Sequence, residues 1–116
     1  GFKRCKGIKV PLRTASSTHV FHQYTLQVNN GKRDALQQFL KRRNIPSMVY
    51  YPLPLNDQHA FRQAVRPVEK PEVASQLCKT VLSLPIHTEM REDEIQYIIQ
   101  QVNAFFESDG LQAGCE

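Results

Sequence analysis

Two tyrosines, two prolines and two side-chain amides lie close together near the middle of the chain, in the stretch Val49-Tyr50-Tyr51-Pro52-Leu53-Pro54-Leu55-Asn56-Asp57-Gln58. Proline has no amide donor and pushes the residue before it towards extended backbone, so we expect a stiff arm that leaves a strand. The rings and phenols of Tyr50 and Tyr51, with the amides of Asn56 and Gln58, would suit a polar ligand that carries a ring, such as a sugar or a nucleotide base. The structural alternative is a loop whose prolines lower the entropy of the unfolded chain. The Tyr51–Pro52 bond is a candidate for the cis form.

No other set of residues has the types and spacing of a catalytic or metal site. The glycines form no phosphate-binding loop, and no G-x-S-x-G segment occurs that would hold a serine nucleophile. His19 and His22 are three apart in a predicted strand, so they would point to opposite faces and could not easily share a metal. The cysteines lack zinc spacing and are expected to be reduced thiols. The residues alone therefore predict no catalytic residue and no metal ligand.

The composition indicates one soluble domain. Of the 116 residues, 41% are hydrophobic and 22% are charged, which is ordinary for a globular protein. No apolar run approaches the roughly 18 residues that cross a membrane, and no signal peptide is apparent, so we expect a cytoplasmic protein without a membrane partner. The net charge of +4 is modest, and no aromatic residues are interleaved with the basic cluster at residues 41–43. Nucleic acid is therefore not an expected partner.

Strand and helix patterns alternate on the way to the arm. Residues 19–28 alternate between apolar and polar side chains and predict a strand. Residues 32–43 have a helical apolar stripe, and Asn44 is expected to end this helix in the left-handed conformation. Residues 47–51 are expected to form a short strand that leads into the arm.

Three further elements are expected after the arm. Residues 56–63 suggest a brief helical turn, and Pro71 opens a helix to about residue 80 with an apolar face formed by Val73, Ala74, Leu77 and Cys78. Residues 81–84 are a short apolar strand. The last helix has its cap at Thr88 or a neighbour and ends at 108–110, and its apolar stripe comprises Ile95, Ile98, Ile99, Val102, Phe105 and Phe106.

This order of elements predicts an α/β fold, a small layered sandwich in which a short mixed sheet carries helices mainly on one face. We expect residues 1–18 to be a connecting segment with one short strand near residues 8–10. Residues 19–107 would form the folded domain, and residues 108–116 a flexible tail.

Four segments, in this order, resemble the C-terminal small domain of the DegT/StrS-type nucleotide-sugar aminotransferases, which use pyridoxal phosphate on the fold type I scaffold. The resemblance extends over residues 8–107. The segments are His22-Gln23-Tyr24-Thr25, the helix from Arg33-Asp34 to Leu40 with Asn44-Ile45-Pro46, the arm Tyr51-Pro52-Leu53-Pro54-Leu55, and Leu82-Ser83-Leu84-Pro85-Ile86-His87.

The resemblance implies a role for this chain in moving an amino group, usually from glutamate, onto a keto-sugar attached to a nucleotide. It implies a C-terminal domain fragment that lines and closes the substrate site, and a homodimer when the protein is full length. Pyridoxal phosphate would belong to the full-length protein and would not bind this fragment, because the lysine that holds it lies in the large domain. The fragment alone would then be inactive.

The resemblance, together with the polar and aromatic groups of the arm, predicts substrate contact by Tyr50, Tyr51, Asn56 and Gln58 and catalysis by none of them. Tyr51 matches the family pattern, whereas Tyr50 stands where a histidine is common, and Gln27 stands where arginine is frequent. Two alternatives remain open at this point. One is a stand-alone binding module without enzymatic activity, and the other is the corresponding domain of a related pyridoxal phosphate-dependent sugar dehydratase.

Overall fold

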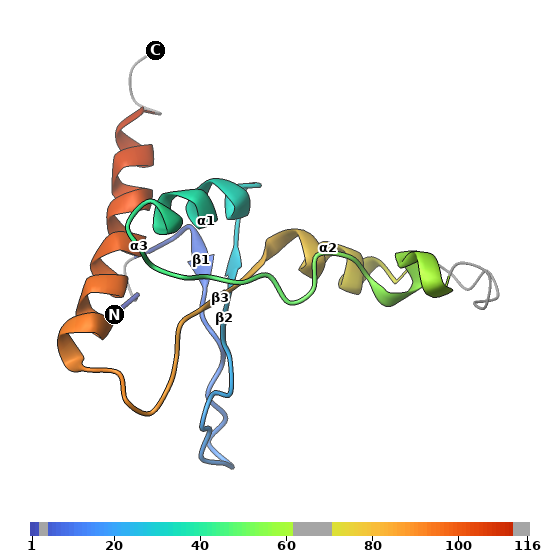
Figure 1. The fold of residues 1–116 in the computed structure, drawn as a ribbon, viewed down its shortest axis with the longest axis horizontal. Helices are drawn as coiled ribbons and strands as arrows, with labels where there is room; N and C mark the ends of the chain where they lie inside the picture. The colour runs from blue at the N-terminus through green and yellow to red at the C-terminus, as the bar shows by residue number, and fades with distance from the viewer. Residues whose placement is uncertain (3–4, 62–70, 113–116) are drawn as a thin grey trace.

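A small three-stranded sheet lies at the centre of the computed structural model (Figure 1). The structure describes residues 1–2, 5–61 and 71–112, with side chains as far as residue 108. Its elements, in chain order, are β1 (Ile8–Lys9), β2 (Tyr24–Val28), α1 (Arg33–Lys41), two 3-10 turns (Leu55–Asp57 and His59–Phe61), α2 (Glu72–Thr80), β3 (Val81–Leu84) and α3 (Glu92–Gln112).

The sheet has the order β1-β2-β3, and both of its strand pairs are antiparallel. The α/β class is confirmed, but the expected mixed sheet is not found among the described residues. Residues 47–51, which were expected to be a strand, do not form one. Pro46 and Pro52 flank this segment and supply no amide donors, and it makes a single antiparallel bridge, Met48 to Ser83, at the outer edge of β3. This segment therefore also runs antiparallel to its neighbour, and the described part of the sheet contains no parallel pair.

One face of the sheet carries the hydrophobic core. α1 and α3 pack against each other over this face, as expected (Figure 1). The largest fully buried side chains among the described residues are Leu26, Val28, Leu36, Leu40, Leu82 and Val102. Within the segment 1–18, β1 confirms the expected short strand, and Ile8 joins the core at 8% exposure.

α2 contributes less to the core than the sequence predicts. It projects from the end of the sheet, away from α3, instead of lying over the apolar face (Figure 1). Val73 is consequently 75% exposed, and the other three residues of the predicted face are only half-buried.

Several element boundaries differ from those expected. β2 begins at Tyr24 and not at residue 19, because Phe21 has a φ of +47°, which interrupts the extended backbone. Asn44 has a φ of +57°, which confirms the left-handed residue after α1. The helical turn expected at 56–63 is present as the two 3-10 turns, while residues 62 and 63 lie outside the described part.

The last helix has Glu92, Asp93 and Glu94 in its first turn, where acidic residues are favoured, and it runs further than expected. It begins at Glu92, where the backbone amide of Arg91 donates to Oε2 of Glu94 at 2.9 Å. Its backbone continues through 108–110 to Gln112, although glycine at 110 is a poor helix former. Ile98 and Val102 are buried, whereas Ile95, also on the predicted stripe, is 36% exposed. In the described part of the chain no helix is both long and apolar enough to cross a membrane.

Candidate functional site

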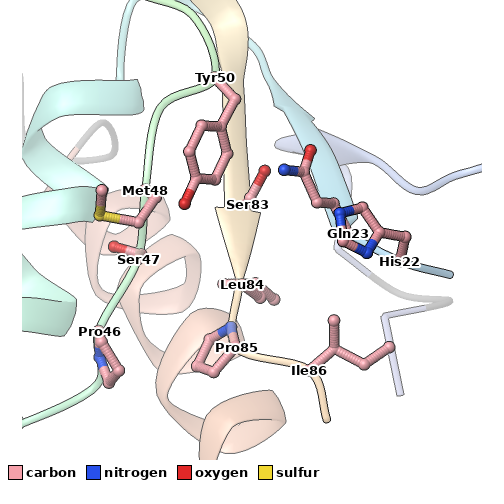
Figure 2. Close-up of a pocket in the computed structure, with 10 residues that line it drawn as sticks. All are labelled: His22, Gln23, Pro46, Ser47, Met48, Tyr50, Ser83, Leu84, Pro85 and Ile86. Carbon is pink, nitrogen blue, oxygen red and sulfur yellow. The ribbon is translucent and has the colours of Figure 1, made fainter.

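A cleft of about 320 Å³ opens where the proline-rich segment passes the end of β3 (Figure 2). One wall is formed by Pro46, Ser47, Met48 and Tyr50. His22 and Gln23, just before β2, form the opposite wall, and the end of β3 with Pro85 and Ile86 runs between them. The walls are positioned by the sheet, because β2 and β3 are paired and Met48 is bridged to Ser83. The cleft therefore rests on hydrogen-bonded strands of the sheet.

Tyr50 is the predicted site residue that lines this cleft. Figure 2 shows the hydroxyl end of its ring pointing towards the space between Met48 and Ser83. Tyr51 turns away and is 69% exposed, and its ring is edge-on to that of Tyr50 at 6.0 Å between centroids. The cis peptide bond lies between Tyr50 and Tyr51, not at the predicted Tyr51–Pro52 bond.

Asn56 and Gln58 lie further along the chain and do not line the cleft. Asn56 uses its amide locally, because Nδ2 donates to Oδ1 of Asp57 at 3.1 Å. The backbone amide of Gln58 donates to the carbonyl of Leu55 at 3.2 Å and closes the first 3-10 turn. The turn separates both amides from Tyr50, so the structure does not bring the four predicted residues together.

Four polar residues of the cleft were not predicted: His22, Gln23, Ser47 and Ser83. Ser83 is only 6% exposed, and its hydroxyl lies 2.8 Å from the hydroxyl of Thr25 on β2. A serine between the apolar residues of β3 was the signal in the sequence that could have pointed to this site. The pairing of Ser83 with Thr25 could not be seen there, because 58 residues separate them.

The described lining of the cleft contains no lysine, arginine, aspartate or glutamate. Its polar groups are hydroxyls, an amide and the imidazole of His22, set among proline and aliphatic side chains. Such groups can donate and accept hydrogen bonds to an uncharged polar ligand, but they offer no bidentate partner for a phosphate. In the described part of the chain, no group of three or more His, Cys, Asp or Glu residues is arranged to hold a metal ion.

Comparison with known proteins identifies the family. Residues 1–103 match the model of the DegT/DnrJ/EryC1/StrS aminotransferase family, and the chain belongs to this family. The resemblance inferred from the four sequence segments is thereby confirmed.

The chain is similar to individual members over most of its own length. A "Pleiotropic regulatory protein" of Geobacillus stearothermophilus is 40% identical over 85% of this chain. The UDP-N-acetyl-3-dehydro-alpha-D-glucosamine 3-aminotransferase of Acidithiobacillus ferrooxidans is 38% identical over 78% of it. The structure of DesV from S. venezuelae superposes with a TM-score of 0.83 at 25% identity, covering 91% of this chain and 28% of DesV. The chain spans about a quarter of the length of the curated relatives, 26% and 24% respectively.

Proposed function

We propose that this chain is the C-terminal part of a longer pyridoxal phosphate-dependent aminotransferase and that it lines and closes the site for a nucleotide-linked keto-sugar. The observation that carries this proposal is the cleft beside Tyr50. It belongs to a chain of an aminotransferase family, and its described lining combines apolar side chains with polar ones and has no lysine, arginine, aspartate or glutamate. A relative at 38% identity is named for amino transfer to a UDP-linked dehydro-sugar, which supports the same class of substrate here. Glutamate as amino donor and a homodimeric, cytoplasmic enzyme complete the proposal.

The residues described here do not fit the cofactor itself. Pyridoxal phosphate supplies the chemistry of amino transfer when it is bound, and it is held through a lysine and through contacts to its phosphate. The described lining of the cleft contains neither lysine nor arginine. We therefore assign no cofactor contact to this chain, whose proposed task is to bind and orient the sugar nucleotide.

The remaining predicted residues are proposed to contact the substrate outside the cleft. Tyr51, Asn56 and Gln58 follow Tyr50 along the arm, and Tyr51 presents an exposed ring. A flat, exposed aromatic face can stack on a nucleotide base. In this proposal Tyr50 contacts the part of the substrate in the cleft, and the arm reaches towards the nucleotide.

The direct test is an amino-transfer assay with the full-length protein that carries this segment. Glutamate and a nucleotide-linked 3-keto-sugar are supplied with pyridoxal phosphate, and formation of 2-oxoglutarate and of the amino sugar is followed by mass spectrometry. We expect glutamate-dependent turnover by the full-length protein and none by residues 1–116 alone. Sugar consumption without any glutamate requirement would instead indicate the dehydratase alternative.

A second candidate is a regulatory role without catalysis. One observation favours it: the relative at 40% identity is named a pleiotropic regulatory protein. The same assay separates the two, because a regulator without enzymatic activity would form neither 2-oxoglutarate nor an amino sugar.

A further inference from the structure

Ser83 is a buried polar residue in a strand whose other residues are apolar. Its backbone is fixed from both directions, because its amide donates to the carbonyl of Met48 at 2.8 Å and its carbonyl accepts from the amide of Met48 at 3.0 Å. Its side chain is fixed by the 2.8 Å contact between the hydroxyls of Ser83 and Thr25. Figure 2 shows this side chain between Tyr50 and Gln23, at the floor of the cleft.

The hydroxyl pair retains unused hydrogen-bonding capacity. Each hydroxyl has one proton to donate and two lone pairs that accept, and the contact between Ser83 and Thr25 uses one donor and one acceptor. Among the described residues the two side chains have no other partner. Whichever of the two donates, the hydroxyl oxygen of Ser83, which lines the cleft, keeps at least one lone pair for a group that enters it.

The charge and size of the cleft restrict what that group can be. A diphosphate is normally met by arginine, lysine or a cluster of backbone amides, and neither arginine nor lysine is among the described lining residues. Pro46, Pro85 and Ile86 supply apolar surface for the face of a ring, beside hydroxyl and amide groups for its substituents. A volume of about 320 Å³ is at the small end of ligand sites and suits one ring rather than a whole nucleotide-sugar.

From these observations we infer that the cleft receives the uncharged, hydroxyl-bearing ring of the ligand, and that Ser83 is a specificity-determining residue that contacts this ring. Thr25 is a positioning residue that acts through Ser83. The inference rests on the proposed function, because it names the part of the sugar nucleotide that lies in the cleft. A site built to hydrogen-bond a ligand hydroxyl discriminates strongly against ligands without it, since its buried groups would then lose their partners.

The test compares probes with and without the sugar ring on the full-length protein. Dissociation constants are measured by calorimetry for UDP-N-acetylglucosamine against UDP, and for dTDP-glucose against dTDP. We expect S83A to raise the dissociation constant of the sugar nucleotide by about fivefold to tenfold, as for the loss of one hydrogen bond. The dissociation constant of the bare nucleotide should stay within about twofold of the wild-type value. T25V should likewise weaken binding of the sugar nucleotide but not of the bare nucleotide. T25S keeps the hydroxyl and should bind the sugar nucleotide as tightly as the wild type does.

The exposed hydroxyl pair of Thr14 and Ser17, 3.0 Å apart in the loop before β2, provides the matched control. S17A should change neither dissociation constant. Equal weakening of both probes by S83A, or no weakening of either, would overturn the inference. If S83A does not fold, the comparison of T25V with T25S decides by the same criteria. A wild-type protein that binds none of the four probes would contradict the proposed function itself, whereas one that binds them with S83A unchanged would contradict only the role of Ser83.

Discussion

At the scale of single residues, two glycines exclude a side chain for different reasons. A Cβ on Gly7 would overlap the ring of Phe106, whereas Gly31 faces open space but has a φ of +68°. We predict that G7A lowers the free energy of unfolding by about 1–3 kcal/mol through overpacking. G31A should cost about 1 kcal/mol through backbone strain.

Urea denaturation of the chain, followed by circular dichroism, measures both effects. Asparagine tolerates the left-handed region, so G31N should recover most of the loss seen in G31A. A G7A variant as stable as the wild type would show that the backbone of the first segment does not approach α3 as described.

The candidate site was only partly predictable at this scale. Tyr50 could be identified because an aromatic residue before two prolines is a local signal. Ser83 could not, because its role depends on its register with Thr25 across two strands. Asn56 and Gln58 were expected to join Tyr50, but the first 3-10 turn carries them away from the cleft.

At the scale of elements, Arg33 at the start of α1 connects two helices. Its Nη1 donates to the carbonyls of Cys78 and Val81, at 3.3 and 3.4 Å, where α2 ends and β3 begins. The side chain is 13% exposed, so these contacts are largely shielded from water. We predict that R33M lowers the free energy of unfolding by about 1–3 kcal/mol, as measured by urea denaturation.

The matched control for R33M is Arg42, an exposed arginine just after α1. R42M should change the free energy of unfolding by less than about 0.5 kcal/mol. Equal effects of the two substitutions would contradict a special role of Arg33 at the junction of α2 and β3.

The start of α3 carries a pH-dependent contact. Arg91 donates to Asp93 at 3.0 Å, and this hydrogen bond lowers the pKa of the Asp93 carboxyl below its ordinary value of 3.8. The folded chain therefore favours the carboxylate. The contact therefore contributes to the stability of the folded chain at neutral pH. This stabilisation is lost as the pH falls below 3.8 and through the lowered pKa of Asp93.

We predict that R91Q raises the pKa of Asp93 towards its ordinary value, as followed by NMR titration of the side-chain carboxyl. R91K keeps the charge but loses the planar fork, so it should give an intermediate pKa. An unchanged pKa in R91Q would contradict the assigned cause.

Element types could be predicted more readily than their ends. The apolar spacing of α3 and β3 is a local property, so both were found from the sequence. The start of β2 depends on the positive φ of Phe21, whose ring is buried, and such a turn has no periodic signal. The exposure of Val73 depends on where α2 lies relative to the sheet, which helical periodicity cannot tell.

At the scale of the whole molecule, the layered α/β class followed from the order of strands and helices, and the four sequence segments pointed to the family that the comparisons identify. The antiparallel arrangement of the sheet could not be predicted from that order. The direction of β3 depends on the path of the chain between β2 and β3, which has no local signal in the sequence. The proposed function is a property of a longer protein, because the chain spans about a quarter of its relatives' length.

The central claim is that Tyr50 contacts the substrate of an aminotransferase. It is tested most directly by kcat/KM for amino transfer to a nucleotide-linked keto-sugar, measured on the full-length protein as wild type, Y50A and Y97A. Tyr50 and Tyr97 are almost equally exposed, at 41% and 43%, but only Tyr50 lines the cleft. We predict that Y50A lowers kcat/KM about tenfold, through lost ring and hydroxyl contacts, while Y97A stays within about twofold. Equal values for the two variants, or no amino transfer by the wild type, would contradict the account.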